Sequence, residues 1–237
     1  MRIGIFFMCL LPVLAGCQSV KTYYEITDPT YVSANYYVHP EFDQMSIRRV
    51  LFAPIRNETT YFEETLGLDD AFMKQWSAIH RFELLPAMGG LRDSLQNIDL
   101  RGRGRFYKLR LFDIGERFNI DAIIFTTLTS YFPYEPCQLG INAQMIHTRT
   151  GDIVWAVDEH YDGNQREVAN LAKEYYYEKL RFSHPLMDWK IMLVSMKYFS
   201  EMAASNIAHT FIQEEKMLRI DESLLKTATV LDAPPRR

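Results

Sequence analysis

Residues 122–128 read Ala-Ile-Ile-Phe-Thr-Thr-Leu, and this nearly continuous apolar run decides the fold. Such a run is typical of a central strand that is covered on both faces. Downstream, the period of the apolar residues changes to two over 139–145, and a second alternating run covers 153–161 after the turn at 150–152. The two runs predict an antiparallel hairpin that extends a parallel core.

Upstream of the central run, the sequence predicts two strand–helix units. Residues 48–55 and 81–85 read as strands, and residues 89–104 read as a loop with at most a short helical turn. The first helix carries its apolar stripe on Leu68, Phe72, Trp76 and Ile79. The second helix carries Tyr107, Leu111, Ile114 and Phe118 at helical spacing. Both stripes predict helices that pack one face on the sheet.

Two more helices are predicted after the hairpin, over 165–180 and about 190–213. The apolar face of the last one consists of Met196, Phe199, Ala203 and Ile207. We therefore expect an α/β (α+β) fold in the order β-α-β-α-β-β-β-α-α. Its mixed sheet has parallel core strands and an antiparallel hairpin, with helices packed on the sheet. The predicted domain spans 46–215, and residues 216–237 form a polar C-terminal tail.

The composition is that of an ordinary folded protein. Of the 237 residues, 48% are hydrophobic and 24% are charged, which excludes a globally disordered chain. The formal net charge is −4. Because nucleic-acid binding usually depends on a basic surface, we expect no nucleic acid among the partners.

The first 17 residues predict export and lipid attachment. Arg2 precedes the apolar run 3–14, which is shorter than the roughly 20 residues that span a bilayer. The run ends in Leu14-Ala15-Gly16-Cys17, which resembles the bacterial lipobox. This resemblance implies that residues 1–16 are a lipoprotein signal peptide, removed before a diacylglyceryl and N-acyl lipid is held on Cys17. No other cofactor is expected.

Gln18 bears on which membrane receives the lipid. An Asp at this position would resemble an inner-membrane retention signal, and Gln18 does not. We therefore expect an outer-membrane lipoprotein that faces the periplasm, with outer-membrane lipid as a partner. Cys137 would remain as the one free thiol, so no internal disulfide can stabilise the domain.

Residues 17–45 join the lipidated cysteine to the predicted domain. The segment lacks periodicity and is rich in tyrosine. It is either a tether that lies loosely on its own domain or a segment that packs on a partner, because tyrosine offers a large contact area at low entropic cost. The candidate interface residues here are Tyr23, Tyr24, Tyr36 and Tyr37.

Two further stretches are candidate contact surfaces. Tyr131, Phe132 and Tyr134 follow the central strand, and they either pack back on the core or form a subunit interface. A basic stretch precedes that strand, and it is either a solvated loop or an anion contact for lipid phosphate or an acidic neighbour. Its cations are Arg101, Arg103, Arg105, Lys108 and Arg110.

The sequence contains no Gly-x-Ser-x-Gly, P-loop, His-Glu-x-x-His or Cys-x-x-Cys motif, so no catalytic or metal-binding residue is predicted. His147 and His160 are separated along the predicted hairpin and do not form a metal pair. Asp158 and Glu159 point to opposite faces of a strand, and we expect both to be solvated charges.

Three ordered stretches resemble the TolB N-terminal-like, CsgG-like and LpoB-like periplasmic domains. They are Val50–Thr59 (a strand, a Pro and Asn-x-Thr), Asn119–Leu128 (the third strand) and Ala143–Ala156 (a hairpin with Thr-Gly and Trp). Asn119, Thr126 and His147 depart from the pattern at positions where the family usually has Gly, Gly and Asp.

The resemblance implies a non-enzymatic protein that works in an envelope machine. The leading hypothesis is an outer-membrane lipoprotein that acts as a self-associating scaffold subunit for secretion, polysaccharide export or a flagellar motor ring. The alternative is an LpoB-like regulator that activates a peptidoglycan synthase. The regulator would be monomeric, with a tether long enough to cross the wall. An enzyme is a third and weaker hypothesis.

Overall fold

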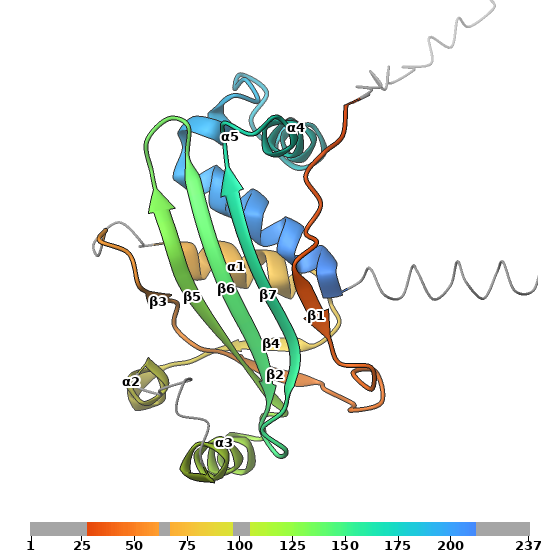
Figure 1. Ribbon diagram of the computed structural model, residues 1–237, viewed down its shortest axis with the longest axis vertical. Coiled ribbons are helices and arrows are strands. Elements are labelled where there is room, and N and C mark those ends of the chain that lie inside the picture. The colour runs from red at the N-terminus through yellow and green to blue at the C-terminus, as the bar shows by residue number, and fades with distance from the viewer. Residues whose placement is uncertain (1–27, 62–66, 97–104, 212–237) are drawn as a thin grey trace, which may run out of the picture.

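The computed structural model describes residues 28–61, 67–96 and 105–211, and Figure 1 shows their arrangement. The described strands form one mixed sheet in the order β1-β7-β6-β5-β2-β4, and β3 also pairs with β5. The strands are β1 (Tyr36–Val38), β2 (Arg49–Phe52), β3 (Arg56–Asn57), β4 (Glu83–Pro86), β5 (Ala122–Phe132), β6 (Gln138–His147) and β7 (Ile153–Asp162).

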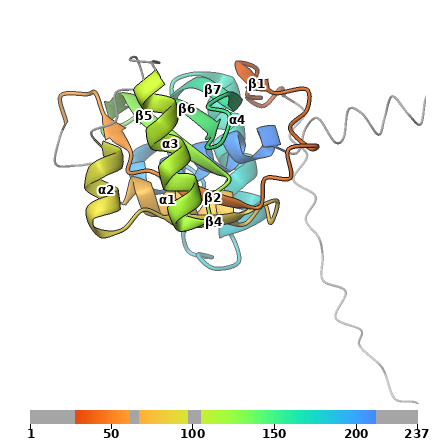
Figure 2. The same ribbon diagram turned by 90° about the horizontal axis from the view of Figure 1, so that it is seen from below.

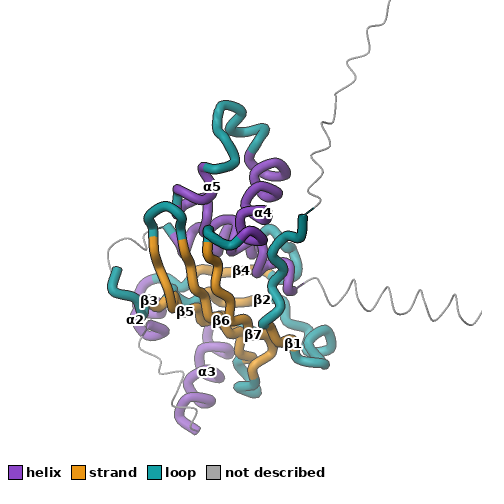
Figure 3. Tube along the Cα trace, turned by 45° about the horizontal axis from the view of Figure 1, so that its top comes forward, coloured by secondary structure: helices purple, strands orange, loops and turns teal. Residues whose placement is uncertain are grey.

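Helices cover both faces of this sheet. They are α1 (Leu68–Ser77), α2 (Gly89–Gln96), α3 (Arg105–Phe118), α4 (Arg166–Tyr175), the π-helix η1 (Tyr176–Leu180), α5 (Ile191–Val194) and a last helix over residues 196–211, called helix 196–211 below. Figure 3 shows that α4 and α5 lie at one end of the sheet and α3 lies at the other. Figure 2 looks from the α3 end.

The predicted fold class is confirmed. β2 pairs in parallel with both β4 and β5, so the parallel core is the predicted one. β5, β6 and β7 form an antiparallel meander, which is the predicted hairpin on the edge of that core. The residues Ala122–Phe125 are all buried, as expected for a strand between two layers of helices.

The two faces of the sheet carry separate apolar cores. The larger core joins β6 and β7 to α1, α4 and helix 196–211, with Trp76, Trp155 and Phe199 fully buried in it. The smaller core joins β2 and β5 to α2 and α3 through Leu95, Leu111 and other side chains. The side of the hairpin that faces away from the larger core carries the exposed side chains of Asp158 and His160.

Several predicted elements differ in detail. The loop expected at 89–104 contains α2, a helix of eight residues. Phe118 was expected on the buried stripe of α3 but is 41% exposed, because Asn119 adopts a positive φ of 53° and turns the chain into β5 directly after it. Asn is one of the few residues that adopt this conformation readily, which explains how it replaces the usual Gly.

The helix expected over 190–213 is interrupted at Ser195, where the backbone is extended. The carbonyl of Leu193 accepts a hydrogen bond from the amide of Cys137 at the start of β6, at 2.9 Å. This carbonyl is therefore paired with the sheet and not with the next helical turn. The interruption fixes α5 against the β5–β6 connection.

Gly115 sets how closely α3 approaches the hairpin. A Cβ at this position would lie 2.6 Å from Oγ1 and 2.7 Å from Cβ of Thr148. Thr148 cannot easily move, because its hydroxyl donates to the carbonyls of Ile120 and Asp121 at 2.8 and 2.9 Å. We expect Gly115→Ala to destabilise the protein by about 1–3 kcal/mol in chemical denaturation, since overpacking outweighs the better helix propensity of alanine.

Gly90→Ala in α2 is the matched control for that prediction. A Cβ at Gly90 has no other atom within 4 Å, so the substitution adds helix propensity without a clash. We expect it to leave stability unchanged or to raise it by up to about 1 kcal/mol. Equal stability of the two variants would contradict the close packing inferred at Gly115.

Candidate functional site

The chain that precedes the predicted domain is built into the fold. Residues 28–38, called the strap below, cross α4 and end in β1, which pairs antiparallel with β7. Asp28 forms an ion pair with Arg166, and the carbonyl of Pro29 accepts a hydrogen bond from Asn170 Nδ2 at 2.9 Å. The expected loose tether is therefore wrong for this part of 17–45, because a strand and several hydrogen bonds hold it.

Glu159 is the centre of the strap's attachment. Its side chain comes from β7 and is 5% exposed, so the expectation of a solvated charge was wrong. One carboxylate oxygen accepts the amides of Ala34 and Asn35 at 2.9 and 3.1 Å, and the other accepts the hydroxyl of Tyr31. Burial, followed by this hydrogen bond and the charge of Glu159, raises the pKa of the Tyr31 phenol well above its ordinary value.

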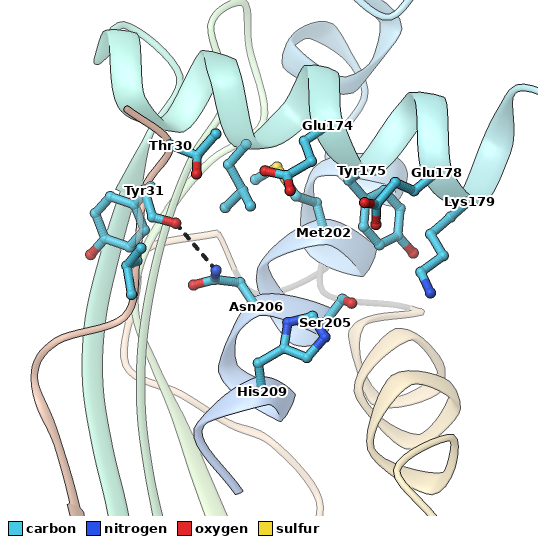
Figure 4. A pocket seen from close by; sticks show the side chains of 12 residues that line it. Thr30, Tyr31, Glu174, Tyr175, Glu178, Lys179, Met202, Ser205, Asn206 and His209 are labelled. Atoms are coloured by element: carbon cyan, nitrogen blue, oxygen red, sulfur yellow. Dashed lines mark hydrogen bonds between the residues drawn. The ribbon is translucent and has the colours of Figure 1, made fainter. Parts of the chain in front are cut away.

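A second polar group ties the strap to helix 196–211. Asn206 Oδ1 accepts hydrogen bonds from Ser33 Oγ at 2.7 Å and from the Tyr161 hydroxyl at 2.9 Å. Its Nδ2 donates to the carbonyl of Tyr31 at 3.4 Å, which Figure 4 draws as a dashed line. Because Tyr161 is fully buried, these contacts join the strap, the sheet and the helix in one network.

The strap closes one side of a cleft of about 400 Å³ (Figure 4). Its other walls are α4 with η1, and helix 196–211. The polar side chains that line it include Thr30, Glu174, Glu178, Lys179, Ser205, Asn206 and His209. No local sequence pattern indicates this cleft, because the strap is more than 100 residues from the other two walls along the chain.

The electrostatics of the cleft are dominated by two acidic side chains one helical turn apart. Burial raises the pKa of Glu174, the negative charge of Glu178 raises it further, and a hydrogen bond with Thr30 opposes both effects. Tyr175 at the base also has a raised pKa because of burial, and its hydroxyl accepts from Gln75 Nε2 at 2.8 Å. The arrangement favours a small group with hydrogen-bond donors or a positive charge.

The end of the sheet beyond α4 carries exposed apolar side chains. They come from the end of β5 and the β5–β6 connection, from residues 181–190 between η1 and α5, and from α5. The exposed members are Phe132, Tyr134, Phe182, Leu186, Met187 and Val194. Cys137 lies beneath them, fully buried, and burial raises the pKa of its thiol to about 11, so it is an unreactive core residue.

The predicted interface tyrosines are distributed over different environments. Tyr131 is buried in the core beside Tyr61, whereas Phe132 and Tyr134 are exposed and form an edge-to-face pair with ring centroids 5.4 Å apart. Tyr36 and Tyr37 lie on β1, and Tyr37 is exposed. Tyr23, Tyr24 and the predicted lipidation residue Cys17 lie outside the described residues.

The predicted anion-contact residues are only partly described. Arg101 and Arg103 lie outside the described residues, and Arg105 begins α3. Lys108 and Arg110 are exposed on α3, where Lys108 covers Gly151 and Arg110 donates to the carbonyl of Ser94 at 3.3 Å. The helix that carries them lies at the end of the sheet opposite α4, which forms one wall of the cleft (Figure 1).

The two histidines of the hairpin do not meet. His147 is at the turn, where its amide donates to the carbonyl of Asp152, and His160 lies opposite Gly140 near the other end of β6. Burial, and then the charge of Arg149, lowers the pKa of His147. Within residues 28–61, 67–96 and 105–211, no group of three or more His, Cys, Asp or Glu side chains could hold a metal ion.

Comparison with known proteins gives matches in structure only. No protein-family model matches the chain, and no curated protein matches it significantly. The solved structures that match include the lipoprotein GNA1162 from Neisseria meningitidis, with 17% identity and a TM-score of 0.38, covering 59% of this chain and 99% of that one.

No described helix is long and apolar enough to cross a membrane.

Two further solved structures also match this chain distantly. The PelC dodecamer from Paraburkholderia phytofirmans matches with 12% identity and a TM-score of 0.35, covering 48% of this chain and 71% of that one. E. coli LpoB matches with 11% identity and a TM-score of 0.36, covering 68% of this chain and 82% of that one. The resemblance to CsgG-like and LpoB-like domains is thus confirmed as a distant similarity of fold, and it extends no further than the fold.

Proposed function

We propose that this chain is a non-enzymatic outer-membrane lipoprotein, anchored through Cys17 and facing the periplasm, that acts as an assembly subunit of an envelope machine. The observation that carries the proposal is the attachment of the strap close behind the lipobox. Only residues 18–27 separate Cys17 from Asp28, the first described residue, which forms an ion pair with Arg166 of α4. Fully extended, this segment reaches at most about 36 Å, so the domain works close to the membrane that holds its lipid.

The same observation weighs against the alternative role as a peptidoglycan-synthase activator. That role depends on a tether that crosses the wall, and residues 18–45 alone would reach about 90 Å if all were extended. Because the strap, which includes β1, is held on the domain, residues 28–38 cannot extend away from it, and most of this length is not available as a tether. A subunit that assembles at the membrane surface needs no such reach.

Self-association is proposed to use α3, at the end of the domain opposite α4 (Figure 1). Leu109 and Phe112 are exposed on it, three residues apart and therefore on the same face of the helix. Lys108 and Arg110 lie in one turn of this helix and Asp113 and Glu116 in the next, and the basic Arg117 follows in the last turn. Two copies packed antiparallel would therefore place opposite charges together around an apolar strip, as a two-fold interface requires.

The oligomeric state tests this self-association. We expect residues 18–237 to form a dimer or larger species in light scattering at tens of micromolar, and the double variant Leu109→Ser/Phe112→Ser to be monomeric. The control is Met88→Ser, which removes a comparably exposed side chain beside α2. A strict monomer for the unsubstituted protein would refute the scaffold role.

Anchoring is tested separately with Cys17→Ser in cells. We expect the unsubstituted protein to incorporate palmitate and to fractionate with the outer membrane, and the variant to do neither, because several acyl chains are needed for a stable anchor. Crosslinking in the same cells distinguishes the two roles. Recovery of self-contacts supports the assembly subunit, whereas recovery of one wall synthase without self-contacts supports the activator.

A further inference from the structure

Residues 181–190, called the apical loop below, present large apolar side chains to solvent. Phe182 is 84% exposed and Leu186 is 99% exposed, and Met187 lies beside them. Side chains of this size in water are costly at about 25 cal/mol per Å² of apolar surface. Their concentration within one short loop points to a surface that they meet in function.

The apical loop is held in place by its own hydrogen bonds. The hydroxyl of Tyr176 donates to the carbonyl of Met187, and the amide of Met187 donates to the carbonyl of His184 at 3.1 Å. The amides of Ser183 and His184 both donate to the carbonyl of Leu180, at 3.1 and 2.9 Å. The protruding side chains are therefore presented by a fixed turn, so little conformational entropy is lost when they are buried.

Cations and aromatic rings surround these apolar tips. Arg181 lies over the rings of Tyr177 and Phe182, and Lys173 lies over the ring of Trp189. Lys179, which precedes the loop, and Lys190, its last residue, are also exposed. Apolar tips with a rim of Trp, Tyr, Lys and Arg are typical of segments that rest in the interface of a bilayer.

The position of the apical loop agrees with such a contact. The described chain begins with the strap on α4, and α4 leads through η1 directly into the loop (Figures 1 and 3). The start of the strap, at Asp28 and Pro29, and the loop thus lie at the α4 end of the sheet, whereas β1 at the other end of the strap pairs with β7 nearer the β6–β7 turn. If Cys17 is lipidated, the ten residues 18–27 keep the α4 end within about 36 Å of the bilayer.

We propose that the apical loop is a second membrane contact, in which Phe182, Leu186 and Met187 enter the lipid surface beside the lipid anchor. This inference rests on the anchor proposed at Cys17. It goes beyond the anchor because it fixes the orientation of the domain, with α4, η1 and α5 toward the bilayer and α3 pointing away. The proposed α3 interface would then remain free for assembly away from the membrane.

The test uses the full mature, lipidated protein in vesicles of phosphatidylethanolamine and phosphatidylglycerol, with an environment-sensitive fluorophore on a single new cysteine. Leu186→Cys carries the probe in the apical loop, and Met88→Cys carries it on a control side chain that is 72% exposed. Cys137 is fully buried and Cys17 is lipidated, so neither competes for the label. We expect blue-shifted emission and quenching by spin-labelled lipid at position 186 only.

A second measurement uses protein without the lipid anchor, so that only the apical loop can hold it on the vesicles. Cys17→Ser protein is mixed with the same vesicles, and Phe182→Ser/Leu186→Ser is expected to weaken its partitioning roughly tenfold or more, whereas Met88→Ser leaves partitioning unchanged.

The outcomes separate the loop contact from the anchor. A probe at position 186 that remains in water while the lipidated protein floats with the vesicles would overturn the loop contact and leave the anchor intact. A blue shift that depends on protein concentration and needs no lipid would also overturn it, and would assign the loop to a contact between copies.

Discussion

Replacing Glu159 with alanine is expected to lower the free energy of unfolding by about 2–4 kcal/mol and to release the strap from the domain. The carboxylate accepts two backbone amides and the Tyr31 hydroxyl, and it is nearly inaccessible to solvent. Hydrogen bonds to a charged group contribute about 1.5–3 kcal/mol each, and the donors left behind would be only partly satisfied by water. Chemical denaturation followed by fluorescence measures the loss.

Asp158→Ala is the matched control, because Asp158 is the neighbouring acid on the same strand and its side chain is exposed on the other face. We expect its effect to stay within about 0.5 kcal/mol. The rate of amide hydrogen exchange in residues 28–38 measures directly whether the strap is held on the domain. We expect this rate to rise in Glu159→Ala and not in Asp158→Ala. If both variants have the same stability and the same exchange, Glu159 does not hold the strap.

A double-mutant cycle resolves which donor matters most. Tyr31→Phe removes the hydroxyl that donates to Glu159, and Glu159→Gln removes the charge but keeps one carbonyl acceptor. We expect a coupling energy above about 0.5 kcal/mol for this pair, as for other residues in one hydrogen-bond network. If the effects of the two substitutions are strictly additive, the hydroxyl of Tyr31 contributes nothing through Glu159, and the carboxylate stabilises the strap only through the amides of Ala34 and Asn35.

The strap also shows which part of the fold was predictable. β5, β6 and β7 were predicted because long runs of apolar residues with a clear period dominate them. β1 has three residues, and its pairing with β7 depends on a partner more than 100 residues away, so no local pattern indicates it. Part of a segment that is tyrosine-rich and aperiodic therefore became a strand through tertiary contacts.

The burial of Glu159 could have been predicted from the alternation of apolar residues along β7. The buried side chains of β7 alternate through Trp155, Val157 and Tyr161, and Glu159 has the same parity. A charge at a buried position of a strand requires partners, which is a reason to expect a polar attachment there. The cleft had no such signal, because its lining depends on how three distant segments pack.

The largest loss of stability is expected from Trp155→Ala. Trp155 is fully buried on β7, where its ring stacks on Phe211 at a centroid distance of 4.3 Å and meets the edge of Trp76 at 5.7 Å. Its indole N–H donates to Thr210 Oγ1 at 2.9 Å. One side chain thus joins the sheet to α1 and to helix 196–211.

Removal of this ring leaves a cavity that its rigid neighbours cannot close. We expect a loss of about 3–5 kcal/mol, which corresponds to a fall of roughly 10 °C in the melting temperature of a domain of this size. Since total stabilities of about 5–15 kcal/mol are typical, the variant would lose a large fraction of its stability. Thermal and chemical denaturation monitored by circular dichroism both measure this.

Two further variants separate packing from hydrogen bonding at this position. Trp155→Phe keeps an aromatic ring but removes the indole donor to Thr210, and we expect it to lose clearly less stability than Trp155→Ala. Trp189→Ala removes the same amount of side chain from a partly exposed site at the edge of the same core, so its loss should be the smaller of the two alanine variants. An equal loss at Trp189 would mean that the complete burial and ring stacking of Trp155 add nothing beyond what a partly exposed tryptophan contributes to the same core.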